Sequence, residues 1–229
     1  MRKIKLLIMK FGVVIFPGSN CDRDMINALE NDLGQEVISL WHKDRDISMF
    51  DTSDCIVLPG GFSFGDYLRC GAIARFSPMM QSVIEFANKG GKVFGVCNGF
   101  QILCESGLLP GVLLQNEQMK FACKNVLLKA GDTDEIFKIP VAHGEGRYFA
   151  KEKELEEIEK NNQVLYSYCD ENGIVHTDHS PNGSIHSIAG ITNKERNVFG
   201  MMPHPERACN PMLGNTDGRK IFKELFSIN

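Results

Sequence analysis

Residues 91–101 read Gly-Lys-Val-Phe-Gly-Val-Cys-Asn-Gly-Phe-Gln, and this stretch decides the fold. A short apolar run ends in Gly95-Val96-Cys97-Asn98-Gly99, and the spacing of apolar residues that follows predicts a helix from Phe100. Gly-x-Cys-x-Gly between a strand and a helix resembles the elbow that raises a nucleophile above an α/β sheet. Glycines suit such a strained turn, and the helix dipole would favour a thiolate. The alternative is a buried cysteine at an ordinary turn.

Apolar runs on both sides of this stretch predict a parallel sheet. Their continuous character is typical of strands that are covered on both faces. Strand-like runs alternate with helical patterns, which predicts an α/β fold with an open, mostly parallel sheet and helices on both faces. The strand-like runs are 11–16, 36–40 and 55–58, and the helical patterns are 22–33 and 80–87.

The second half of the chain is less regular. Runs at 112–114 and 125–128 predict a small antiparallel addition, and the runs 188–192 and 198–202 predict a hairpin. A last helix is expected from about Asp217. The length of 229 residues predicts one domain over residues 9–229, with residues 1–8 as an N-terminal extension and Met9 as an alternative start.

Composition excludes several function classes. The formal charge of −4 and the lack of a basic stripe argue against nucleic acid as a partner. The apolar run Leu6–Met9 is too short for a signal peptide or a membrane span, so no membrane partner is expected. No Gly-x-Gly-x-x-Gly or Walker loop is present, so we expect neither a dinucleotide nor ATP to bind this chain.

The eight cysteines are scattered, without a Cys-x-x-Cys pair. Such a pattern is typical of free thiols in a reducing cytoplasm, and we expect a cytoplasmic protein. It also lacks the spacing of zinc ligands, so no metal site is predicted.

A cysteine nucleophile needs a base and a group that orients the base. His204 and Glu206 suit these roles, because residues two apart in an extended segment point to the same side. Pro203 and Pro205 would stiffen the pair. The segment 143–145, His-Gly-Glu, has the same spacing and is a rival, but its central glycine provides no such stiffness. We therefore favour His204 and Glu206, although spacing alone leaves both pairs open.

Acyl transfer also needs donors for a developing oxyanion. The backbone N–H of Asn98, directly after the cysteine, is one candidate. Gly60 and Gly61 end a neighbouring strand, and a glycine N–H there could provide the second donor. An ordinary βα turn is the alternative. The loop 62–68 follows at the sheet edge where ligands bind in open α/β sheets.

Three motifs together resemble the class I (triad) glutamine amidotransferases. They are Pro59-Gly60-Gly61, the segment 95–101 and His204-Pro205-Glu206. The resemblance implies a flavodoxin-like amidotransferase fold. Longer segments resemble the family of separate glutaminase subunits of phosphoribosylformylglycinamidine synthase, from about Met9 to the C-terminus. These segments are 16–22, 60–69, 142–147 and 202–207.

The resemblance implies a catalytic role for each motif. Cys97 would attack the side-chain amide of glutamine and form a γ-glutamyl thioester. His204 would relay the proton and Glu206 would orient His204. Gly61 and Asn98 would be the oxyanion donors.

Further residues of these motifs have implied roles at the substrate. Gln101 is similar to the family residue that contacts glutamine. Phe64, His143, Glu145 and Arg147 are expected in loops that either enclose glutamine or dock a partner.

The resemblance also implies partners. Ammonia would pass to a large synthetase subunit, which would use ATP and Mg to convert formylglycinamide ribonucleotide to the amidine in purine biosynthesis. A small third subunit would bridge the two, and this chain would hold no cofactor.

Two other hypotheses for the function stay open. One is a stand-alone cysteine hydrolase or peptidase that acts without a partner. The other is a non-catalytic module with Cys97 as a redox sensor or core thiol, against which Gln101 and the His-Pro-Glu motif count.

Overall fold

The computed structural model describes residues 9–131, 133 and 135–228. The predicted extension at residues 1–8 lies outside the described residues, and the division at Met9 stays a prediction. The strands are β1 Lys10–Ile15, β2 Glu36–Trp41, β3 Cys55–Leu58, β4 Lys92–Val96, β5 Val112–Leu114, β6 Ala122–Ala130, β7 Ile136–His143, β8 Arg147–Phe149, β9 Val164–Cys169, β10 Ile188–Thr192 and β11 Val198–Met201. The α-helices are α1 Asp22–Asn27, α2 Pro78–Asn88, α3 Asn98–Glu105, α4 Glu152–Lys160 and α5 Asp217–Phe226.

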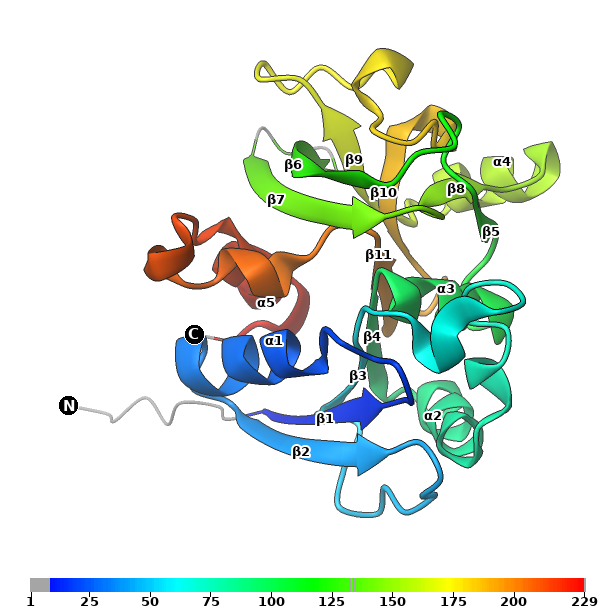
Figure 1. The fold of residues 1–229 in the computed structure, drawn as a ribbon, viewed down its shortest axis with the longest axis vertical. Helices are drawn as coiled ribbons and strands as arrows, with labels where there is room; N and C mark the ends of the chain where they lie inside the picture. The colour runs from blue at the N-terminus through cyan, green and yellow to red at the C-terminus, as the bar shows by residue number, and fades with distance from the viewer. Residues whose placement is uncertain (1–8, 132, 134, 229) are drawn as a thin grey trace.

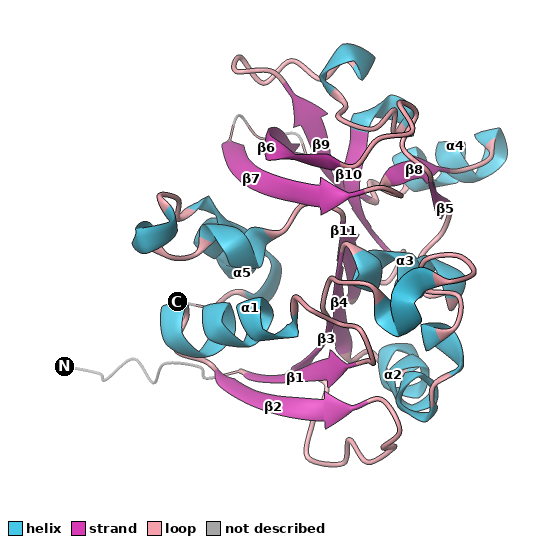
Figure 2. Cartoon of the chain, viewed as in Figure 1, coloured by secondary structure: helices cyan, strands magenta, loops and turns pink. Residues whose placement is uncertain are grey.

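One twisted sheet runs through the molecule, in the strand order β2-β1-β3-β4-β11-β10-β9-β6-β7 (Figure 2). The first five of these strands pair in parallel. The last four extend the sheet with antiparallel pairs. The predicted α/β fold is confirmed. Strands β5 and β8 form a separate antiparallel pair. The antiparallel part of the sheet is therefore larger than the small addition predicted from the sequence. The β10–β11 hairpin joins this part to the parallel half.

Helices cover both faces of the parallel half, as predicted. Figure 1 shows α1 and α5 on one side of β3 and β4, and α2 and α3 on the other. Helix α5 presents Phe226 to the sheet, where its ring lies 5.4 Å from that of Phe11 and 5.6 Å from that of Phe94. These large buried rings anchor the helix by removing apolar surface from water.

The helix predicted at residues 22–33 consists of an α-helical segment followed by a π-helical segment. Helix α1 continues into a π-helical turn over Ala28–Asp32, where the N–H of Leu33 donates to the carbonyl of Ala28. Met25 and Leu29 are fully buried, as the apolar spacing predicts. Within the described residues, no helix is both long enough and apolar enough to cross a membrane.

The parallel strands end at a common edge, and three candidate site residues follow these ends. β3 leads to Gly60, β4 leads directly to Cys97, and β11 leads to His204. Carboxyl ends of parallel strands are where ligands bind in open α/β sheets. The topology therefore brings together residues that lie far apart in the chain.

Candidate active site

The strand-to-helix elbow at Cys97 has the strained backbone that its sequence predicts. Cys97 adopts φ 52° and ψ −106°, a combination that costs free energy in any residue other than glycine. Its N–H donates to the carbonyl of Met201 on the neighbouring strand, and its carbonyl accepts from Gln101 in the first turn of α3. The sheet and the helix thus hold the cysteine from both sides.

The last glycine of the elbow has a steric reason. A Cβ atom on Gly99 would lie 1.9 Å from the backbone oxygen of Leu58, at the end of β3. The close approach lets α3 begin directly against the neighbouring strand. Any side chain at this position would force the helix away from the sheet edge.

We expect Gly99→Ala to lower the free energy of unfolding by about 1–3 kcal/mol or more, because the clash is with backbone that cannot rotate away. Urea unfolding would measure the loss. Gly144→Ala is the control, since a Cβ there would meet only Phe121, at 3.7 Å. Equal stability of the two variants would contradict this account of the elbow.

His204 and Glu206 form a buried pair. Nδ1 of His204 lies 2.6 Å from Oε1 of Glu206, and both residues are at most 3% exposed. The extended conformation that was predicted for this segment is wrong. His204 is the N-cap of a 3-10 turn over Pro205–Ala208, and this turn brings Glu206 back to the imidazole. The N–H of His204 also donates to the carbonyl of Pro140.

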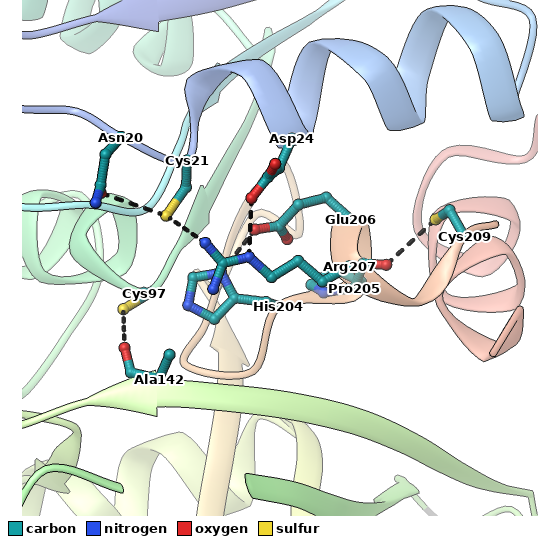
Figure 3. A network of polar contacts seen from close by, with 10 residues as sticks. All are labelled: Asn20, Cys21, Asp24, Cys97, Ala142, His204, Pro205, Glu206, Arg207 and Cys209. Carbon is teal, nitrogen blue, oxygen red and sulfur yellow. Dashed lines mark hydrogen bonds and ion pairs between the residues drawn. The ribbon is translucent and has the colours of Figure 1, made fainter. Parts of the chain in front are cut away.

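The imidazole of His204 extends towards Cys97 (Figure 3). Burial by itself lowers the pKa of His204, but Glu206 and Cys97 together outweigh burial and raise the pKa above its usual value. Glycine at position 60 makes this approach possible, because a Cβ there would lie 2.7 Å from Cε1 of His204 and 3.4 Å from Cβ of Cys97. The arrangement favours an imidazolium beside the sulfur.

Several polar atoms of the site have no hydrogen-bond partner among the described residues. They include Nε2 of His204 and Oε2 of Glu206. The thiol of Cys97 donates to the carbonyl of Ala142, with 3.8 Å between sulfur and oxygen. Buried polar groups are usually paired, so unpaired atoms around a nucleophile indicate a place for a ligand.

The rival pair does not form. His143 is buried and bonds through Nδ1 to Oδ1 of Asn116, at 3.1 Å, with no hydrogen bond to the Glu145 side chain in the described part of the chain. The backbone carbonyl of Glu145 accepts instead from Nε2 of Gln101. Burial, and then His204, lowers the pKa of His143 to about 4. The environment therefore pushes the pKa values of His143 and His204 in opposite directions.

A cavity of about 180 Å³ opens above Cys97. This volume is well below the roughly 300–1,000 Å³ of pockets for drug-sized ligands, which favours a small substrate. Six residues named from the sequence line it: Gly61, Cys97, Gln101, His143, Glu145 and His204. The loops 62–68 and 143–147, expected to enclose glutamine or dock a partner, also contribute Phe62, Asp66 and Gly144. The remaining lining residues were not named from the sequence: Asn20, Cys21, Cys70, Phe121, Ala142 and Arg207.

The other residues named from the sequence lie around the cavity without lining it. The side chain of Asn98 donates to Gln101 at 2.9 Å. Phe64 packs on Phe16 and His42, with ring centroids 6.4 and 5.3 Å away. Phe62, two residues earlier in the same loop, lines the cavity.

Arg147 also lies outside the cavity, in β8, where it pairs with Leu114 of β5. In the part of the chain that the structure describes, no group of three His, Cys, Asp or Glu side chains could hold a metal ion.

Charged groups of both signs lie at the cavity wall. Nη2 of Arg207 contacts Sγ of Cys21 at 3.1 Å, and its Nε donates to Asp24 at 2.9 Å. Burial raises the pKa of Asp66, and the nearby charge of Glu145 adds to the effect. The segments 16–22 and 202–207 contain Cys21 and Arg207, so the resemblance offered a signal for these two residues.

A strained cysteine at the end of a central parallel strand, beside a buried His–Glu pair, is the arrangement of an enzyme with a cysteine–histidine–glutamate triad. Residues 9–223 match the family of CobB/CobQ-like glutamine amidotransferase domains. The chain belongs to this glutamine amidotransferase family.

Relatives within the family are similar over nearly their full length. "Phosphoribosylformylglycinamidine synthase subunit PurQ" of Gloeobacter violaceus is 51% identical, with 95% of this chain and 97% of the relative covered. The protein of the same name from Nostoc sp. is 52% identical, with 95% and 96% covered. The structure of PurLQS from Thermotoga maritima contains a chain that is 39% identical, with a TM-score of 0.81, over 96% of this chain and 99% of that chain.

Proposed function

We propose that this chain is the glutaminase subunit of a phosphoribosylformylglycinamidine synthase and releases ammonia from glutamine at Cys97. The observation that carries the assignment of the site is the strained Cys97 beside the buried His204–Glu206 pair, at the floor of a small cavity. Full-length relatives at about half identity support the assembly and the pathway, which is purine biosynthesis.

The reaction begins with attack of the Cys97 sulfur on the amide carbon of glutamine. Backbone N–H groups of Asn98 and Gly61 stabilise the oxyanion. Asn98 begins α3, and first-turn N–H groups of a helix lack acceptors within the helix. His204 then donates its proton to the amide nitrogen, the C–N bond breaks, and a thioester remains. Water attacks the thioester with His204 as base, and glutamate leaves. Glu206 keeps the imidazole oriented throughout.

Recognition of glutamine uses the charges at the cavity wall. Arg207 can bind the α-carboxylate, while Asp66 and Glu145 can bind the α-ammonium. A cation at Asp66 would relieve the cost of its burial beside another carboxylate. The side-chain amide of Gln101 accepts from Asn98 through Oε1 and donates to the carbonyl of Glu145 through Nε2. Its second N–H and the second acceptor position of Oε1 contact the substrate.

Ammonia passes to a large synthetase subunit, which uses ATP and Mg²⁺, and a small subunit bridges the two. Absence of a glycine-rich phosphate loop in this sequence supports that division of labour. We also place the complex in the cytoplasm, which the eight unpaired cysteines support.

Labelling with a diazoketone analogue of glutamine, followed by peptide mapping, tests the proposal. We expect modification at Cys97, fast in the assembled complex and slow in the isolated chain, because docking gates the site. Cys104→Ser, on the same helix, should be labelled like the wild type. Modification elsewhere would contradict the assignment of the nucleophile. Full turnover of glutamine by the isolated chain would instead favour a stand-alone hydrolase.

A further inference from the structure

Asn116 determines which nitrogen of His143 carries the proton. Its Nδ2 donates to the backbone carbonyls of Lys120 and His143, at 2.8 and 2.9 Å. The amide is therefore oriented with Oδ1 towards Nδ1 of His143, at 3.1 Å, and Oδ1 also accepts from the N–H of Gly146. An amide oxygen can only accept, so Nδ1 must carry the hydrogen.

Nε2 of His143 is consequently a hydrogen-bond acceptor. It is buried and has no partner among the described residues, although the residue lines the cavity. The ring cannot easily turn away, because it packs so closely on Gly146 that a Cβ there would lie 2.3 Å from Nδ1. Burial, and then His204, keeps the ring neutral by lowering its pKa to about 4.

This acceptor belongs to a residue that lines the same cavity as Cys97 and His204. The preceding residue, Ala142, accepts from the Cys97 thiol through its carbonyl, and the charge of His204 acts on His143. The ionic partners for the α-groups of an amino acid are other residues, Asp66, Glu145 and Arg207. A neutral acceptor in the wall of the cavity that holds Cys97 suits the N–H groups of the amide end.

We propose that Nε2 of His143 accepts a hydrogen bond from the amide nitrogen of glutamine as this nitrogen leaves. The inference rests on the proposed glutaminase function and adds a second histidine contact to it. His143 neither gains nor loses a proton in this role, and its partner Asn116 is a positioning residue.

The proposed contact strengthens as the bond breaks. In the tetrahedral intermediate, Nε2–H of His204 gives its proton to the –NH₂ group, which becomes –NH₃⁺. The electron pair of the C–N bond moves to nitrogen, the oxyanion re-forms C=O, and ammonia leaves.

The positive charge on the leaving nitrogen makes its N–H groups stronger hydrogen-bond donors. Nε2 of His143 and the carbonyl of Ala142 are acceptors for them. The effect should therefore appear in kcat rather than in KM.

Two variants separate this role from a structural one. Asparagine at position 143 can replace Nδ1 but does not reach the position of Nε2, whereas glutamine can place an oxygen there. In the assembled complex we expect His143→Asn to lower kcat for glutamine by about 10- to 100-fold, the value of one hydrogen bond to a charged group, with KM nearly unchanged. His143→Gln should keep most of the activity. A wild-type kcat for His143→Asn, or equal losses in both variants, would overturn the proposal.

The same variants distinguish this proposal from the function on which it rests. Both should keep ammonia-dependent synthesis and labelling at Cys97. If the wild type itself were not labelled at Cys97, the glutaminase assignment would fail instead.

¹⁵N NMR provides a test that needs no variant at position 143. In histidine-labelled Cys97→Ser protein, His143 should show the neutral Nδ1–H tautomer from pH 8 to about pH 5. Glutamine should shift its Nε2 resonance, and glutamate, which lacks the amide N–H groups, should not. An Nε2–H tautomer, or equal responses to the two ligands, would overturn the proposal even if the variants at position 143 failed to fold.

Discussion

Replacement of Cys97 by serine is expected to abolish glutamine-dependent synthesis by the assembled complex while ammonia-dependent synthesis continues. The loss should be roughly 10⁴-fold or more, because a serine hydroxyl beside His204 is a much weaker nucleophile than a thiolate. The two activities can be measured side by side with glutamine or an ammonium salt as nitrogen source. Added ammonia bypasses Cys97 and enters the reaction at the synthetase.

Cys104→Ser is the matched control for this experiment. Cys104 lies on the same helix, and its thiol donates to the carbonyl of Pro110 rather than facing the cavity. Its replacement should leave both activities near the wild-type level. Loss of ammonia-dependent synthesis in Cys97→Ser would contradict the division of labour between the subunits.

His204→Ala should reduce glutaminase activity by about 10²- to 10⁴-fold, the usual contribution of a general acid–base group. The expected cause is loss of the imidazolium that the buried Glu206 stabilises, and with it the proton for the leaving nitrogen. Measurement of kcat at saturating glutamine in the assembled complex would show the effect. His143→Ala should lose less, because it removes a hydrogen-bond acceptor rather than the proton donor.

A reversed ranking of the two histidine variants would show that the catalytic pair was wrongly chosen. Both side chains are buried, so thermal unfolding should first establish that each variant is folded. Glu206→Gln adds an internal check: it removes the charge that raises the pKa of His204, and it should lower kcat with less structural disturbance than His204→Ala.

Much of the site follows from short-range sequence features. Gly-x-Cys-x-Gly predicts the elbow because only glycine lets α3 begin against β3, and the clash at Gly99 shows the reason. His204 and Glu206 are two residues apart, so their pairing needs only a local turn. Continuous apolar runs predicted the parallel strands because strands covered on both faces have no polar side.

The sequence predicted that Cys97 and His204 meet, but it did not predict two other contacts across long stretches of chain. Asn116 and His143 are 27 residues apart, and Cys21 and Arg207 are 186 apart. Phe64 and Phe62 are two residues apart in the same loop, yet only Phe62 lines the cavity. No periodicity distinguishes them, because the irregular backbone of the loop turns Phe64 onto Phe16.

The amino-acid sequence by itself determined the α/β fold, the nucleophile elbow and the spacing of the His–Glu pair. These depend on steric and periodic rules that act within a few residues. Tertiary structure alone decided the charge and hydrogen-bonding state of the two histidines. Glu206 and Cys97 raise the pKa of His204 against the effect of burial, while burial and then the charge of His204 lower the pKa of His143. Asn116 fixes the tautomer of His143. Such properties depend on solvent exclusion and on partners that only the folded chain brings together.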